Sequence, residues 1–191
     1  SLDVSSAVMM HHGAFLQSDL ISKFLRGFAP LVEVFVPDIT LGMEGKDDYR
    51  EIYSTTCHEL AHASHFSKVG KQFWDEYIKY IMVSYAKTGG MTYGDGITPG
   101  AGYCEVGEMW GYYIESKMHK DRYGGAFPTF GTSFWFNPQI FRYLDERGID
   151  CSDIFDVLDD TVSSRNALKQ ALMLSYPSKR DVIEQVFSRY R

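Results

Sequence analysis

The residues of this chain best suited to chemistry are two histidines and a glutamate within five consecutive positions, His58-Glu59-Leu60-Ala61-His62. On a helix, residues four apart lie on one face, so His58 and His62 can offer two imidazoles to one metal ion. Glu59 lies one step round the same turn, where its carboxylate can contact a metal-bound water without being a ligand. This HExxH pattern therefore predicts a zinc site with Glu59 as the general base of a hydrolytic reaction.

The surroundings of the pattern favour a helix that would present it. Acidic residues occupy the start of the segment, as the positive end of a helix dipole prefers, an apolar stripe begins at Ile52, and Gly70 marks the end. These signals predict a helix over about 48–68. The alternative is an ordinary amphipathic helix in which the pattern arose by chance, about once in a hundred chains of this composition.

Composition excludes several classes of function. A formal charge of −6 and an isoelectric point near 5.5 argue against a nucleic-acid binder, because phosphate binding needs a concentrated excess of lysine and arginine. There is no run of about 18 apolar residues, so we expect no transmembrane span. The N-terminus lacks the basic-then-apolar layout of a signal peptide, which is also what a chain with its signal removed would show.

The remaining segments predict a mostly helical α+β protein. Helical spacing of apolar residues predicts a helix over 13–28, and the β-branched segment 31–36 before Pro37 predicts an edge strand. Beside a metal site, such an edge could bind an extended peptide backbone; a plain sheet edge is the alternative. A second helix is predicted over 71–87, with its apolar residues in the core. Those residues are Phe73, Trp74, Tyr77, Ile78, Ile81, Met82 and Tyr85.

The second half of the chain alternates loops with helices. The glycine-rich segment 88–102 predicts a loop that lines a cleft or simply connects two helices, and 103–120 predicts a further helix. The aromatic-rich loop 124–138 either forms a pocket wall or is pinned to the core. Beyond it we expect three or four short packing helices. Their apolar faces are formed by Ile154, Phe155 and Leu158, by Leu168, Leu172 and Leu174, and by Val182, Ile183, Val186 and Phe187.

A tetrahedral zinc site with two imidazoles and a water requires a third protein ligand. His65 lies on the face of His58 and His62, but three ligands along a straight helix span about 10 Å of rise and cannot surround one ion. The metzincin pattern is also excluded, since His65 occupies the position of its helix-breaking glycine. Glu105 and Glu108 on the later helix remain. Glu108 is preferred because its glycine neighbours, Gly107 and Gly111, would permit a close approach.

With these residues in place, the chain resembles the gluzincin group of zincin metallopeptidases. His58-Glu59-Leu60-Ala61-His62 and Glu108-Met109-Trp110-Gly111-Tyr112-Tyr113 carry the resemblance, which extends over about residues 50–115. More narrowly, the stretch is similar to zinc-binding metallopeptidases found as secreted or surface lipoproteins in Bacteroidetes-type bacteria. Tyr112 departs from the family pattern, which often has an acidic residue there. Glu105 therefore stays open as the acceptor for a ligand imidazole or as the third ligand.

The resemblance implies a zincin-like fold and a zinc-dependent peptidase. His58, His62 and Glu108 would ligate Zn²⁺, and Glu59 would deprotonate the attacking water and pass its proton to the leaving amine. The substrate would be a peptide or protein, and the location extracytoplasmic, as a secreted protein or lipoprotein. Candidates for the oxyanion donor are Tyr112, Tyr103, His119 and His65, which the sequence does not rank.

Cys57 and Cys104 each lie beside or one turn from a predicted ligand. They would either form a disulfide, which would indicate an oxidising compartment, or remain two buried thiols.

Two alternatives to the peptidase remain from the sequence. One is a zincin-shaped scaffold module that binds a peptide without cutting it, and the other is a metal hydrolase acting on a non-peptide amide or ester. In each case we expect a single domain over 1–191, with the sheet and HExxH helix in 1–100 and the helical part carrying the third ligand in 101–191. The sequence leaves the oligomeric state open.

Overall fold

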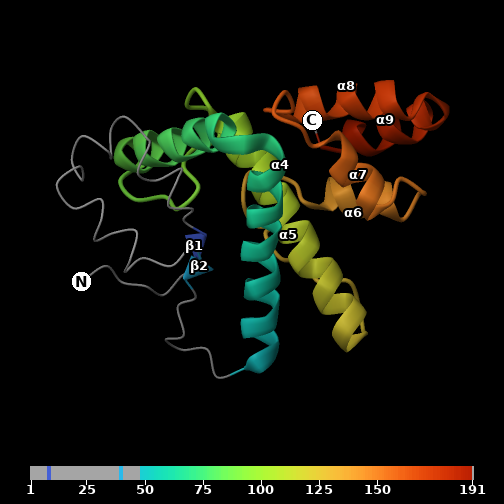
Figure 1. Cartoon of the computed structure of the whole chain (residues 1–191), viewed down its shortest axis with the longest axis horizontal. Helices are drawn as coiled ribbons and strands as arrows, with labels where there is room; N and C mark the ends of the chain where they lie inside the picture. The colour runs from blue at the N-terminus through green and yellow to red at the C-terminus, as the bar shows by residue number, and fades with distance from the viewer. Residues whose placement is uncertain (1–7, 10–38, 41–47, 191) are drawn as a thin grey trace.

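The computed structural model describes residues 8–9, 39–40 and 48–190. At its N-terminal end, β1 (Val8–Met9) and β2 (Ile39–Thr40) pair antiparallel, with Val8 opposite Thr40 (Figure 1). The helix predicted over 13–28 and the edge strand predicted over 31–36 lie outside the described residues. From residue 48 onward the described chain is mostly helical, as the sequence predicts.

The helix α4 (Tyr49–Thr88) carries the HExxH pattern and bends sharply in its middle. Its first turn is capped by Asp48, whose side chain accepts a hydrogen bond of 2.8 Å from the Arg50 amide. Gly70 has φ 77° and ψ −177°, a conformation open almost only to glycine, and it divides α4 into two limbs. The limbs correspond to the two helices predicted over 48–68 and 71–87. Figure 1 shows the second limb turning sharply away from the direction of the first.

Helix α5 (Ala101–Tyr123) runs antiparallel to the first limb of α4 and is the element that faces it (Figure 1). Three cross-helix pairs fix the direction, because residue numbers rise on α5 as they fall on α4. His62 lies opposite Glu108, His58 opposite Glu115, and Ser54 opposite His119.

The other side of α5 packs against the C-terminal helices, and this interface forms the main core. The helices are α6 (Gln139–Asp145), α7 (Cys151–Val157), α8 (Arg165–Ser175), the 3₁₀ helix η1 (Pro177–Lys179) and α9 (Arg180–Ser188). Trp110 of α5 stacks on Phe155 of α7 with ring centroids 5.1 Å apart. Aliphatic side chains from α6 to α9 fill the space behind it, so these helices anchor the back of α5.

Within residues 48–190, three residues predicted to be buried are exposed. Met82, Tyr85 and Leu174 are 38, 54 and 80% exposed. In the second limb of α4, the buried face is instead the one that carries Tyr80 and Ser84, because loop 89–100 folds back onto it. In α8 the neighbouring Met173 is buried, since it continues the stripe of Leu168 and Leu172 better than Leu174 does.

The two long loops, 89–100 and 124–138, meet where Trp135 Nε1 donates a hydrogen bond of 2.9 Å to the Tyr93 carbonyl. Asp95 organises the first one by accepting hydrogen bonds from the amides of Ile97 and Thr98, at 3.0 and 2.8 Å. Phe136 of the second loop is fully buried, so it pins that loop to the core, whereas Phe134 remains 40% exposed beside Tyr93. The first loop is thus more than a connector, because it places Tyr93 against α5.

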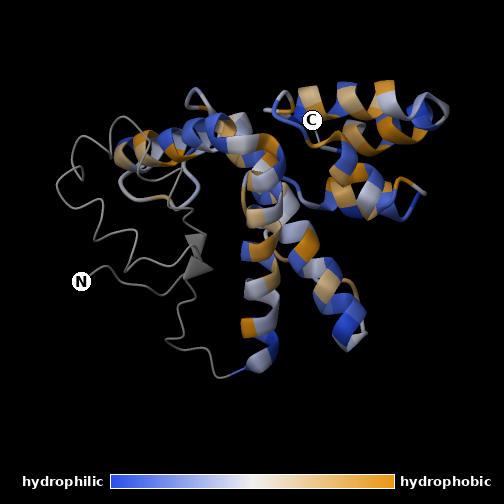
Figure 2. Ribbon diagram, viewed as in Figure 1, coloured by the Kyte–Doolittle hydropathy of each residue, from blue (hydrophilic) through white to orange (hydrophobic). Residues whose placement is uncertain are grey.

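None of the helices in the described part of the chain combines the length and the hydrophobicity needed to cross a membrane. Figure 2 shows hydrophilic residues interspersed along both limbs of α4, the longest of them.

Candidate metal centre

The structure brings His58, His62 and Glu108 together between α4 and α5. One ligand atom from each lies within 4.8 Å of the others, and all three residues are buried. Glu108 Oε2 lies 3.5 Å from His58 Nε2, and Glu108 Oε1 lies 3.4 Å from His62 Nε2. Glu108, the residue preferred as the third ligand, therefore lies beside both imidazoles.

These separations match the edges of a zinc coordination tetrahedron. With bonds of about 2.0–2.2 Å and tetrahedral angles, two donor atoms on one zinc ion are about 3.3–3.6 Å apart. A direct hydrogen bond between an imidazolium and a carboxylate would be about 2.7–2.9 Å long. The two separations, each to a different oxygen of Glu108, are thus longer than direct charged hydrogen bonds and leave room for a small ion between the imidazoles and the carboxylate.

The neighbours of the His58 ring also favour a cation at this position. Its Nδ1 lies 3.1 Å from Glu115 Oε2 and its Nε2 faces Glu108, so both ring nitrogens meet carboxylates. A neutral imidazole has one N–H and can serve only one of them. Burial disfavours the charged ring, yet the two carboxylates raise the His58 pKa to about 10 in the metal-free chain. The two carboxylates thus favour positive charge at His58, which either a proton on the ring or a metal ion bound at Nε2 would provide.

Glu108 has an open position for that charge. Its Oε2 atom is buried and accepts no hydrogen bond, which is costly for a carboxylate unless a cation contacts it. Its Oε1 accepts a hydrogen bond from the Tyr77 hydroxyl. Burial alone would favour the neutral acid, but the neighbouring His62 and His58 lower the Glu108 pKa, so the group is ionised and ready to ligate.

Gly111 makes the close approach of the helices possible. A β-carbon at this position would lie 2.8 Å from His58 Nε2 and 2.9 Å from His62 Cε1, so no larger residue fits without moving an imidazole. At Gly107 a β-carbon would meet only the Tyr77 ring, at an ordinary 3.5 Å. Of the two glycines expected to permit the approach, Gly111 is the one that the imidazoles require.

Glu105 is neither the third ligand nor the partner of a ligand imidazole. It accepts a 2.6 Å hydrogen bond from Arg165 Nε and a further one from the Arg165 amide, which ties α5 to α8. The imidazole partner is instead Glu115, which the sequence analysis did not select. Because α4 and α5 are antiparallel, His58 meets residues that follow Glu108 on α5 rather than residues that precede it.

Glu59 is buried on the same turn as His58, and it is not one of the clustered donors found among the described residues. Its charge is close enough to Tyr112 to contribute, after burial, Glu108 and Glu115, to the raised pKa of that phenol. The Tyr112 ring lies edge-on to His58 at 4.4 Å, and its hydroxyl is 2.8 Å from that of Tyr93. Glu59 and Tyr112 thus border the triad without joining it.

The other three candidates for the oxyanion donor have different neighbours. His119 Nδ1 lies 2.8 Å from Ser54 Oγ, and Tyr103 packs against Phe73. His65 is fully buried among aromatic rings, and this burial lowers its pKa to about 3. Tyr112 is therefore the candidate whose ring contacts a ligand imidazole.

Of the two alternatives left open for Cys57 and Cys104, the structure shows two buried free thiols and no disulfide. All three cysteines are free, and burial raises the pKa of each. The cysteines therefore give no support to an oxidising compartment.

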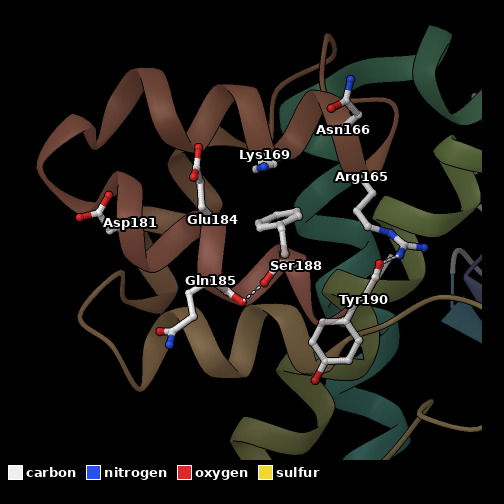
Figure 3. A pocket seen from close by; sticks show the side chains of 9 residues that line it. Arg165, Asn166, Lys169, Asp181, Glu184, Gln185, Ser188 and Tyr190 are labelled. Carbon is white, nitrogen blue, oxygen red and sulfur yellow. Dashed lines mark hydrogen bonds between the residues drawn. The ribbon is translucent and has the colours of Figure 1, made fainter.

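A separate hollow of about 840 Å³ lies between α8 and α9, away from the triad (Figure 3). Its wall includes Arg165, whose guanidinium also donates a hydrogen bond to the Tyr190 carbonyl. Acidic residues of α9, Asp181 and Glu184, line the opposite side. This mixed-charge surface shares no residue with the candidate metal centre.

Comparisons of the chain with protein-family models, with curated proteins and with solved structures found no match.

Proposed function

We propose that this chain is a zinc-dependent peptidase with a zincin-like, gluzincin-type site. The observation that carries the proposal is the buried group of His58, His62 and Glu108 at zinc-compatible spacing, with Glu59 next to the first ligand. Two nitrogen donors and one oxygen donor, with a fourth position left for water, form the donor set of catalytic rather than structural zinc sites. Among common divalent ions this set suits zinc better than calcium or magnesium, which prefer oxygen ligands throughout.

Each protein group has a defined task in amide hydrolysis. Bound zinc would polarise the scissile carbonyl and lower the pKa of the attacking water to about 7. Glu59 takes the proton from that water as it attacks the carbonyl carbon. Glu59 then delivers the proton to the amide nitrogen as the C–N bond breaks, giving a carboxylic acid and a free amine. The Tyr112 hydroxyl is the proposed donor to the oxyanion, and Glu115 holds the His58 ring in its ligating orientation.

The experiment that tests this function is Glu59→Gln. We expect the variant to retain zinc, because Glu59 is not a ligand, and to lose cleavage of a peptide library followed by mass spectrometry. Glu76→Gln is a matched control, since Glu76 lies on the second limb of α4 in a solvent-exposed pair with Lys79. It should cleave like the wild type.

The outcomes separate the peptidase from its alternatives. Cleavage retained in Glu59→Gln would remove the mechanism. A wild type that binds zinc and peptides but cuts none would favour the scaffold module. Hydrolysis of simple amides or esters without peptide cleavage would favour the non-peptide hydrolase.

A further inference from the structure

The Tyr77 hydroxyl contacts the third ligand from a part of the chain outside the HExxH motif. Tyr77 lies on the second limb of α4, beyond the bend at Gly70, and donates a hydrogen bond to Glu108 Oε1. The same helix thus supplies two imidazoles from one limb and a phenol from the other. In the sequence, Tyr77 is one of seven apolar or aromatic residues predicted to be core, and nothing distinguishes it from its neighbours.

The position of Tyr77 is fixed by packing. Its ring lies 4.7 Å from that of Trp74 and faces Gly107 on α5, one residue before Glu108, where an added β-carbon would come within 3.5 Å of it. The helical bend aims the ring at α5, because a straight continuation of α4 would carry it away from the antiparallel pair. The hydroxyl is therefore held at one particular oxygen of Glu108.

The hydrogen bond from Tyr77 gives the two oxygens of Glu108 different surroundings. They lie at nearly equal distances from the imidazole nitrogens, with Oε1 3.4 Å from His62 Nε2 and Oε2 3.5 Å from His58 Nε2. From position alone, both oxygens could ligate the same ion. The Tyr77 hydroxyl occupies Oε1, however, while Oε2 has no hydrogen-bond partner.

We propose that Tyr77 is a positioning residue that keeps Glu108 a one-oxygen ligand through Oε2, so that the centre favours a small four-coordinate ion. A carboxylate that binds through both oxygens raises the coordination number and suits larger ions. A phenol hydrogen bond to one oxygen weakens that oxygen as a metal donor, which disfavours two-oxygen binding and preserves the remaining position for water. The inference rests on the proposed zinc site, but it concerns how that site is shaped rather than whether it cuts peptides.

The test uses Tyr77→Phe in the full chain, with zinc and cobalt(II) as probes. Tyr113→Phe is the matched control, because Tyr113 is also buried on this helix pair and its hydroxyl donates to a carboxylate, Asp145 Oδ2, at 2.7 Å. Zinc affinity is measured by competition with a chelator. Coordination number is read from the visible absorption of the cobalt-loaded protein, which is intense for four-coordinate cobalt and weaker for five or six ligands.

We expect Tyr77→Phe to bind zinc 10- to 100-fold more weakly than the wild type and to shift the cobalt spectrum toward higher coordination. Tyr113→Phe should match the wild type in both. A Tyr77→Phe protein with wild-type affinity and a wild-type cobalt spectrum would overturn the inference while leaving the zinc site intact. A wild type that binds neither metal would instead overturn the proposed function.

If Tyr77→Phe does not fold, 4-aminophenylalanine at position 77 keeps a hydrogen-bond donor at the end of the ring. This protein should give the four-coordinate cobalt spectrum, and a spectrum of higher coordination would also overturn the inference.

Discussion

Gly111 offers the most demanding test of the geometry, because a single methyl group there should weaken zinc binding at the metal centre. In Gly111→Ala the new β-carbon would lie 2.8 Å from His58 Nε2, the nitrogen that faces Glu108. Ordinary carbon contacts begin near 3.4 Å, so the ring must move by about 0.6 Å. Zinc sites hold their ligand distances within about 0.2 Å. The displacement is therefore large on the scale that zinc binding tolerates.

Gly107→Ala is the matched control on the same helix. Both substitutions replace glycine within α5, which should stabilise the helix by about 1 kcal/mol. At Gly107 nothing opposes this gain, because the added carbon meets only the Tyr77 ring at 3.5 Å. At Gly111 the overlap with two imidazoles should cost about 1–3 kcal/mol.

The two variants are compared by chelator competition for zinc and by denaturant unfolding of the metal-free proteins. We expect Gly111→Ala to lose at least about tenfold in zinc affinity and Gly107→Ala to bind like the wild type. Equal zinc affinity in Gly111→Ala and the wild type would refute the close approach of α5 to the imidazoles.

Three further predictions follow from named contacts. Glu115→Gln should weaken zinc binding about 10- to 100-fold in chelator competition, because the orientation of His58 depends on its 3.1 Å contact, and unchanged affinity would contradict that role. Gly70→Ala should lower the free energy of unfolding by about 1–3 kcal/mol, because alanine is strained at the φ of 77° that Gly70 adopts. The added β-carbon would touch nothing within 4 Å, so the strain would come from the backbone alone, and equal denaturant midpoints would contradict this. The Asp95 pKa is lowered to about 2 by the Thr98 and Ile97 amides, so the stabilisation from its charge is present above pH 3.8 and lost as the pH falls through 2. Thermal melts of Asp95→Ala should therefore lie below those of the wild type at pH 6 and approach them near pH 2, and a constant difference would argue against the ionised form.

Much of the candidate site could be predicted from local sequence. Helical periodicity alone places His58, Glu59 and His62 within one helical turn, with both imidazoles on one face, and the glycines that neighbour Glu108 favour it over Glu105. The first of these inferences depends only on the spacing of residues within one helix, and the second on small residues that permit two helices to approach. The limits of both α4 limbs were predictable for the same reason.

The residues that surround the triad could not be predicted in this way. Glu115 reaches the site because α4 and α5 are antiparallel, and Tyr77 reaches it because α4 bends at Gly70. No local sequence pattern predicts either of these arrangements. The spacing of Glu115 from Glu108, two helical turns on one face, was the available signal. It becomes informative only once the antiparallel order of the helices is known.

The exposed side chains of Met82, Tyr85 and Leu174 show a related limit of prediction from sequence. Periodicity predicts a hydrophobic stripe, but the element that covers the stripe decides which face is buried. In the second limb of α4 the loop organised by Asp95 covers the face of Ser84 and leaves Tyr85 exposed. Loop packing of this kind depends on contacts between distant parts of the chain.

The central claim is that His58, His62 and Glu108 hold a zinc ion, and the most direct measurement is zinc stoichiometry at equilibrium. Metal-free wild type and His58→Ala are dialysed against buffered zinc and analysed by elemental mass spectrometry. We predict one zinc ion per wild-type chain and close to none in His58→Ala. Equal zinc in both proteins, or none in the wild type, would contradict the assignment.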